Sequence, residues 1–226
     1  FSTATDSYNT GLGYQAGTAI STGTLNTLVG GLAGDALTTG FNNVAVGTSA
    51  LSAEDTGRYN VAIGKGALAS QNGDYDNYNT AVGAEAGNSV TTATANTLIG
   101  GVAGDALTTG GSNVAIGYQA LQSNAGAENT GVGFRALYEC STGDMNTAVG
   151  EQALVNVTTG DTNTGLGIQA GYTLTTGDNN TFIGSDARPS SATASNEVTL
   201  GNSNVSSLRC NDTSISSLSD RRDKTD

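Results

Sequence analysis

NVAIG at residues 60–64 is the stretch that decides the fold, because close variants of it recur along almost the whole chain. Each copy has Asn, then Thr or Val, a variable residue, an aliphatic residue and Gly, and an Ala follows three residues after the Gly in most copies. The copies begin at Asn9, Asn26, Asn43, Asn60, Asn79, Asn96, Asn113, Asn129, Asn146, Asn163, Asn180 and, in degenerate form, Glu197. Nine of the eleven intervals between these starting positions equal 17, and the other two are 19 after Asn60 and 16 after Asn113. Such a fixed period indicates a repeat protein.

A repeat of this length predicts one turn of a β-solenoid, because it is too short for helical repeats and for propeller blades. Each coil would hold two short strands and two turns, of which the second is a polar stretch often ending in TTG. Stacked strands lie about 4.8 Å apart, so twelve coils would make a rod about 58 Å long. We therefore expect an all-β solenoid over residues 9–201, after a short lead-in at residues 1–8.

Side-chain alternation along a strand predicts which residues form the core. The second and fourth positions of each copy share one face of the strand. The second is always Thr or Val and the fourth is always aliphatic, as at Ile63 and Ile116. We expect both positions to point inward. The recurring Ala, from Ala16 to Ala187, is expected to be a small inward residue on the second strand.

The Asn and Gly of each copy are predicted to be structural. A position that is always Gly usually needs a positive φ or a close backbone approach, which suits the tight corner of a coil. Stacked Asn side chains can bond to each other or to turn backbone in successive coils. The representative positions are Asn26, Asn60, Asn113, Asn146, Gly30, Gly64, Gly117 and Gly150.

The coils also show a longer period. In the first eight coils, those in which Gly follows the recurring Ala and those in which Leu follows it come in pairs. The stretch TLVGGLAGDALTTG at residues 27–40 is nearly repeated as TLIGGVAGDALTTG at residues 97–110, a shift of four coils. We interpret this as the duplication of a four-coil block.

Composition excludes several classes of function. The chain has 226 residues, 33 Gly, one Pro, no Trp and no His, and its net charge is −12. Without His there is no imidazole base and no imidazole metal ligand. The acidic balance disfavours nucleic acid and anionic membranes as partners, and no apolar run approaches the roughly 20 residues of a membrane span. We expect a protein that is not an enzyme, with no cofactor, no nucleic-acid partner and no membrane insertion.

The sequence gives only a weak sign of metal binding and no sign of a disulfide. Asp and Asn in the turns at residues 143–146, 160–163 and 177–180 could bind Ca²⁺. Those residues also favour turns without metal, and the spacing matches neither an EF-hand nor the nine-residue calcium repeat. Cys140 and Cys210 lie in dissimilar sequence and form no CxxC, so we expect two unrelated free thiols.

The expected core predicts self-association. One aliphatic side chain per coil stabilises by about 1.5–3 kcal/mol when fully buried, whereas ordering each residue of the coil costs about 1–2 kcal/mol. Backbone hydrogen bonds offset only part of that. Association with copies of itself would bury more apolar surface per residue. We therefore expect a homotrimer about a threefold axis.

The repeat resembles that of a known family. NVAIG at Asn60 and at Asn113 is similar to the NSVAIG signature of trimeric autotransporter adhesin heads of the YadA type. The resemblance covers residues 9–201 and implies a trimeric, left-handed parallel β-roll. This chain departs from the family in its longer repeat and its more elaborate TTG turns.

A second resemblance lies at the C-terminal end. After a connector at residues 202–218, the stretch SDRRDK at 219–224 resembles the start of the intramolecular chaperone auto-processing domain of phage tail fibres and endosialidase tailspikes. The resemblance implies a self-cleaving dyad of Ser219 and Lys224, because a Lys of lowered pKa can activate a Ser. The bond that it would cleave joins Leu218 to Ser219. The rest of that domain is absent from residues 219–226, so we expect no cleavage in this chain, which we interpret as a fragment or a processed product.

These features predict a structural and host-receptor-binding segment of a bacteriophage tail fibre, located on the virion and therefore extracellular. The expected partners are a host surface glycan or protein receptor and other virion tail proteins. A bacterial adhesin head would share the fold, but no coiled-coil heptads follow the repeats. A monomeric ice-binding or ligand-binding solenoid would show regular outward Thr rows, whereas the Thr and Val here are expected to point inward.

Aromatic residues recur beside the repeat unit. Exposed rings could stack on glycans, and they could equally fill contacts between subunits, so the sequence assigns no ligand-binding residue. The rings before the Asn are Tyr8, Tyr59 and Tyr78, and those after the Gly are Tyr14, Tyr118 and Phe134.

Overall fold

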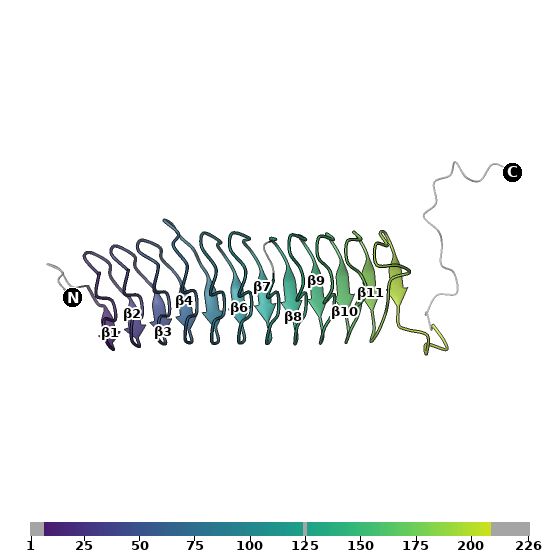
Figure 1. The fold of residues 1–226 in the computed structure, drawn as a ribbon, viewed down its shortest axis with the longest axis horizontal. Coiled ribbons are helices and arrows are strands. Elements are labelled where there is room, and N and C mark those ends of the chain that lie inside the picture. The colour runs from purple at the N-terminus through teal and green to yellow at the C-terminus, as the bar shows by residue number, and fades with distance from the viewer. Residues whose placement is uncertain (1–6, 124–125, 209–226) are drawn as a thin grey trace.

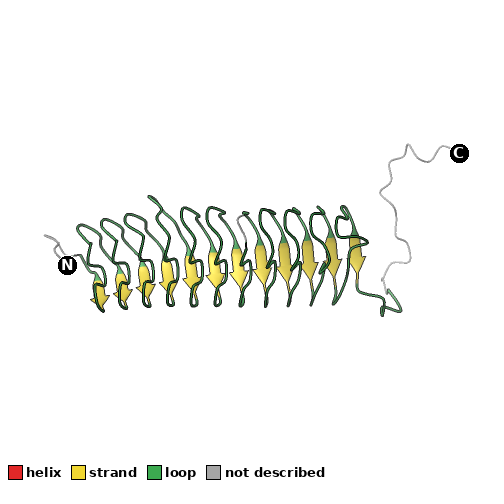
Figure 2. Cartoon of the chain, in the orientation of Figure 1, coloured by secondary structure: helices red, strands yellow, loops and turns green. Residues whose placement is uncertain are grey.

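Twelve short strands form one parallel sheet that runs the length of the molecule (Figures 1 and 2). A computed structural model of the chain describes residues 7–123 and 126–208. The strands are β1 (Thr10–Leu12), β2 (Thr27–Val29), β3 (Val44–Val46), β4 (Val61–Ile63), β5 (Thr80–Val82), β6 (Thr97–Ile99), β7 (Val114–Ile116), β8 (Thr130–Val132), β9 (Thr147–Val149), β10 (Thr164–Leu166), β11 (Thr181–Ile183) and β12 (Val198–Leu200). Each pairs with the next strand along the chain at equivalent repeat positions, as Ile63 does with Val82. The predicted all-β solenoid, with one coil for each copy of the repeat, is confirmed.

Each described coil contains one strand, and the expected second strand is absent from the described residues. The recurring Ala lies in a stretch of consecutive turns instead, although these turns still form hydrogen bonds from coil to coil. Leu68 N donates to Ala86 O over 3.1 Å, and Gly34 N donates to Ala50 O over 2.9 Å. Leu68 has a φ of 50°, which takes the chain out of the extended conformation. The stretch therefore stacks like a strand without being one.

The orientation of the strands is opposite to the prediction. In β2 to β11 the middle residue is buried, and the Thr or Val before it and the aliphatic residue after it are at least partly exposed. Ile63 is 38% exposed and Ile116 is 37% exposed, so neither is the core residue that the sequence predicted. Alternation correctly placed the second and fourth positions on one face. It could not say which face is inside.

The core is richer than one aliphatic side chain per coil. The Ala after the corner is buried from Ala33 to Ala187, as predicted. Larger side chains add to the core from the residue after the Ala, as at Leu51, and from the following turn, as at Leu37. In three coils the middle residue of the strand is large as well, at Leu28, Leu98 and Phe182. The fully buried large apolar side chains are Leu28, Leu37, Leu51, Leu68, Leu98, Leu107, Leu121, Leu137, Leu154, Leu174 and Phe182.

The alternation of Gly and Leu after the Ala is a packing pattern. A Cβ at Gly34 would lie 2.8 Å from side-chain carbons of both Leu28 and Leu37, and a Cβ at Gly104 would lie 2.8 Å from Leu98. Gly at this position therefore leaves room for large side chains from elsewhere in the coil. Where the position is Leu, as at Leu51, that side chain fills the core itself.

Two sharp turns close each coil. The corner glycine after the strand has a positive φ, which is +136° at Gly64, and a Cβ there would lie 2.2 Å from the carbonyl oxygen of Gly83. Both reasons for an invariant Gly therefore apply at the same position. The residue before the Asn is also left-handed although it is rarely Gly or Asn, as at Tyr59 with a φ of 63°. This turn was not predicted.

Candidate functional site

A ladder of buried Asn side chains runs along the start of the strands. The Oδ1 of Asn146 accepts the backbone N–H of Asn163 at 2.9 Å and its Nδ2 at 3.1 Å. The Nδ2 of Asn146 donates across its own coil to Gly160 O at 2.8 Å. In a regular coil the Asn thus closes its own coil and links it to the next one. The members from Asn26 to Asn180 are buried, so every bond is shielded from water.

The predicted site residues fall into three groups. Asn26, Asn60, Asn113 and Asn146 belong to the ladder. Gly30, Gly64, Gly117 and Gly150 are corners with φ between +135° and +137°. Ser219 and Lys224, together with the Leu218–Ser219 bond, lie outside the described residues.

The outward second and fourth positions of β1 to β12 form what we call the outer sheet face. Its fourth-position row is continuous and aliphatic. Eight members of that row are between 36% and 68% exposed: Leu12, Ile63, Ile99, Ile116, Val149, Leu166, Ile183 and Leu200. Thr and Val alternate irregularly along the second-position row beside it. This face is regular, its fourth-position row is apolar, and the members of that row are partly to largely exposed in the described part of the chain.

Across the lengthened coil after Asn60 the ladder keeps its backbone link, since Asn79 N donates to Asn60 Oδ1 at 3.3 Å, and Gln71 adds a side-chain link between the two Asn residues. Gln71 Nε2 donates to Asn60 Oδ1 at 3.0 Å, and Asn79 Nδ2 donates to Gln71 Oε1 at 3.1 Å. Asn60 Nδ2, which in a regular coil would reach a glycine carbonyl, contacts Asn77 Oδ1 at 3.4 Å. Sequence reasoning missed Gln71 and Asn77, although the irregular step after Asn60 marked the coil that contains them.

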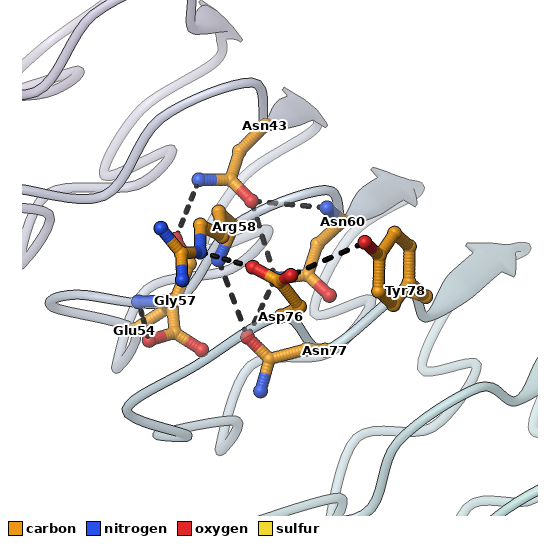
Figure 3. A network of polar contacts seen from close by, with 8 residues as sticks. All are labelled: Asn43, Glu54, Gly57, Arg58, Asn60, Asp76, Asn77 and Tyr78. Carbon is orange, nitrogen blue, oxygen red and sulfur yellow. Dashed lines mark hydrogen bonds and ion pairs between the residues drawn. The ribbon is translucent and has the colours of Figure 1, made fainter.

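The buried carboxylate of Glu54 lies next to Gln71, and Figure 3 shows it beside Gly57 and Asn77. Its Oε1 accepts the N–H of Gly57 at 2.7 Å, and its Oε2 accepts Gln71 Nε2 at 3.2 Å and Gly73 N at 3.3 Å. Regular coils place apolar side chains such as Leu37 at this position. A Cβ at Gly57 would lie 2.4 Å from the carboxyl carbon, so glycine is needed for the carboxylate to fit. The sequence analysis did not single out Glu54.

Rings and charges gather on the surface above the network, forming what we call the aromatic cluster: Phe41, Arg58, Tyr59, Asp76 and Tyr78. Tyr59 and Tyr78 stack with ring centroids 5.1 Å apart and planes 4° apart, and Phe41 meets Tyr59 edge to face at 5.7 Å. The Arg58 guanidinium lies 4.9 Å from the centre of the Phe41 ring. Asp76 pairs with Arg58 and accepts the Tyr78 hydroxyl at 3.2 Å (Figure 3).

The loop that carries this cluster is longer than its counterparts. Residues 72–78 take the place of a shorter stretch in regular coils, and Figure 1 shows the loop between β4 and β5 reaching beyond its neighbours. A recess of about 230 Å³ lies beside the loop, between Asp74 and Tyr75 and the hydroxyls of Thr92 and Thr94 in the next coil. Two larger recesses lie at the ends of the coil stack, lined by parts of the first and last coils.

Glu54 is placed to support the structure and not to transfer protons. Both oxygens of Glu54 already accept protein donors, and the carboxylate is shielded from solvent. Residues 7–123 and 126–208 contain no group of three or more His, Cys, Asp or Glu placed to hold a metal ion. In the turns considered for calcium, Asp161 Oδ1 accepts Asp144 N at 2.8 Å and Asp178 Oδ1 accepts Asp161 N at 2.9 Å, so these carboxylates link coils.

Cys140 is a buried free thiol in the core. Burial raises the pKa of its thiol to about 12, and a hydrogen bond with the Gly143 backbone offsets part of this rise. At neutral pH the group is therefore a small apolar side chain. Cys210 lies outside the described residues.

Comparisons with known proteins add no assignment, because no protein-family model, curated protein or solved structure matches the chain. Nor does the described part of the molecule contain a helix of the length and apolarity needed to cross a membrane. The functional argument consequently depends on the geometry above.

The buried carboxylate predicts a pH dependence. Burial raises the pKa of Glu54 above its ordinary value, and the hydrogen bonds from Gly57, Gly73 and Gln71 lower it and offset part of the rise. The folded protein then retains a proton that the unfolded chain has lost, so the free energy of unfolding should fall as the pH rises through the raised pKa. We expect urea unfolding between about pH 5 and pH 8 to show a steeper decline for the wild type than for Glu54→Gln. Equal slopes would contradict this prediction.

Proposed function

We propose that the chain is a structural and host-receptor-binding segment of a bacteriophage tail fibre, built as a homotrimeric rod of left-handed parallel β-rolls. It would be located on the virion, outside the cell, with other tail proteins and a host surface glycan or protein as partners. Its role would be passive, holding recognition surfaces at a distance from the particle. The similarity of residues 219–224 to a chaperone auto-processing domain supports the phage assignment, and that of NVAIG to adhesin heads supports three chains.

The outer sheet face is the observation that carries the proposal. Twelve strands of three residues, spaced about 4.8 Å apart, present a strip on the order of 600 Å². Thr occupies the second position in eight of the twelve strands, so the apolar part of the strip is mainly the aliphatic row, which crosses every coil. Packing this face against copies of itself would remove the aliphatic row from water along the whole rod.

The physical reason for association therefore differs from the one that the sequence indicated. The expected thin core does not support it, because each coil buries additional large side chains such as Leu51 and Leu107. The support comes instead from Ile63, Ile116 and their equivalents, which point outward. The same residues that the sequence placed inside one chain are those that we propose to lie between chains.

The solution mass tests the proposal. Light scattering on a sizing column should give three times the monomer mass of 22.4 kDa. The double variant Ile99→Glu/Ile116→Glu places two charges on the outer sheet face and should give monomers or non-native aggregates. Thr108→Glu/Thr109→Glu adds the same charge to an exposed turn and should remain trimeric.

Two outcomes would overturn parts of this proposal. A folded wild-type monomer would remove the trimeric fibre altogether. A trimer that persists in the Ile99→Glu/Ile116→Glu variant, with native circular dichroism, would place the interface elsewhere on the molecule.

A second candidate, a monomeric ice-binding solenoid, is favoured by the same face. The sequence disfavoured this candidate because the Thr and Val of each strand were expected to point inward. They point outward, so that expectation is wrong. An outward row of hydroxyls and methyls at a constant strand spacing could order water. Thermal hysteresis measured on a monomeric wild type would support this candidate, and its absence would exclude it.

A further inference from the structure

The aromatic cluster leaves one ring face open in a defined direction. Tyr59 and Tyr78 are equivalent residues of successive coils, so their stack runs from coil to coil. Phe41 closes the stack on the side of Tyr59. In the coil after Tyr78 the equivalent residue is Ala95, whose methyl leaves the next layer without a ring. Tyr78 is 54% exposed, and the face that it turns toward Ala95 has no aromatic partner among the described residues.

Polar groups of the lengthened loop and of the next coil line a recess at the same boundary between coils. The recess beside the loop is lined by Asn72, Asp74 and Tyr75 on one side and by Thr92 and Thr94 on the other. Thr94 immediately precedes Ala95, so the recess and the open ring face belong to the same coil boundary. Tyr75 is 77% exposed and supplies a second ring at the rim.

The ring orientation is set before any ligand arrives. Asp76 accepts the Tyr78 hydroxyl and pairs with Arg58. The buried side chain of Asn77 accepts the backbone N–H of Arg58 at 3.3 Å. An aromatic platform held by neighbouring bonds loses little conformational freedom on binding. The cluster is therefore a built surface, and it exists only where the repeat is lengthened.

We propose that this boundary is a binding site for a neutral saccharide. A hexopyranose ring would stack its apolar C–H face on Tyr78 above Ala95, with its hydroxyls bonded to Asp74, Thr92 and Thr94. The charges favour a neutral sugar over an acidic one, because Arg58 is already paired with Asp76, Asp74 has no described partner and the chain carries a net charge of −12. The site rests on the proposed function and deepens it, since it supplies the receptor class for a trimeric fibre that would bind through three weak sites at once.

Saturation-transfer NMR on the full chain tests the site, with cellotetraose, maltotetraose and mannotetraose as probes. We expect saturation to reach ring protons of at least one probe, with a dissociation constant on the order of 1 mM. Tyr78→Asn should weaken binding by about tenfold or more and should fold normally, because the equivalent residues Asn42 and Asn179 are also left-handed. Tyr75→Ser should weaken binding as well.

The control is the other stacked pair on the rod, Tyr118 and Phe134, whose centroids are 6.1 Å apart. Tyr118→Ala should leave the affinity unchanged. The inference is overturned if none of the three probes binds, or if binding is the same in Tyr78→Asn and Tyr75→Ser as in the wild type. If the protein is a monomer that binds sugar, the trimeric fibre is refuted and the saccharide site is supported. If it is a trimer that binds no sugar, the saccharide site is refuted and the trimeric fibre is supported.

Discussion

The Gly100→Ala variant is expected to lose about 3–5 kcal/mol of the free energy of unfolding. Gly100 has a φ of +137°, a region that residues with a Cβ scarcely enter. The added Cβ would also lie 2.4 Å from the carbonyl oxygen of Gly117, so the next coil would have to move. Because this corner is in the middle of the stack, fraying of an end cannot relieve the clash. Urea unfolding followed by circular dichroism measures the loss.

The neighbouring glycine is the matched control. A Cβ at Gly101 would meet nothing closer than the Tyr118 ring at 3.4 Å, which is ordinary contact, and its φ is not positive. Gly101→Ala should change the free energy of unfolding by less than about 1 kcal/mol. Similar losses in the two variants would show that the corner geometry is not what selects glycine.

The Asn146→Ala variant should lose about 2–4 kcal/mol. It would leave the backbone N–H of Asn163 and the carbonyl of Gly160 buried without the partners that Asn146 supplies at 2.9 Å and 2.8 Å. An unpaired buried polar group costs far more than one that can bond to water. Urea unfolding gives the loss, and hydrogen exchange should show it concentrated at the Asn163 amide.

Asn202→Ala serves as the comparison for the ladder. Asn202 Nδ2 donates to Ser185 O at 3.0 Å and its Oδ1 accepts Asn204 N at 2.9 Å, but both bonds are exposed, so water can replace them. We expect a change below about 0.5 kcal/mol. If Asn146→Ala were as mild as Asn202→Ala, the ladder would be a consequence of the fold and not one of its supports.

The irregular coil shows where repeat reasoning reaches its limit. The longer step after Asn60 marked an insertion, but the consensus could not say that Gln71 would bridge Asn60 and Asn79. Nor could it predict that Glu54 would be buried at a position where most other coils have an apolar residue such as Leu37 or Val90. Both residues depart from the repeat, and their roles depend on partners one coil away. The candidate sugar site likewise arises only where the chain departs from its own pattern.

The sequence by itself determined the number of coils, the position of the first strand in each coil, the corner glycines and the Asn ladder, because each of these features repeats at a constant interval and a parallel stack places equivalent residues side by side. In the described coils, the second strand that it predicted is a stretch of turns instead. The tertiary structure alone decided which face of each strand is buried. Alternation defines two faces that differ by one residue, and the choice between them depends on where the turns direct their side chains. Here the turns carry leucines such as Leu37 and Leu68 into the coil, and in most coils the inner strand position holds a small residue such as Ala62, although β2, β6 and β11 have Leu28, Leu98 and Phe182 there. The aliphatic row is consequently displaced to the outside, where it becomes the surface on which the proposed assembly depends.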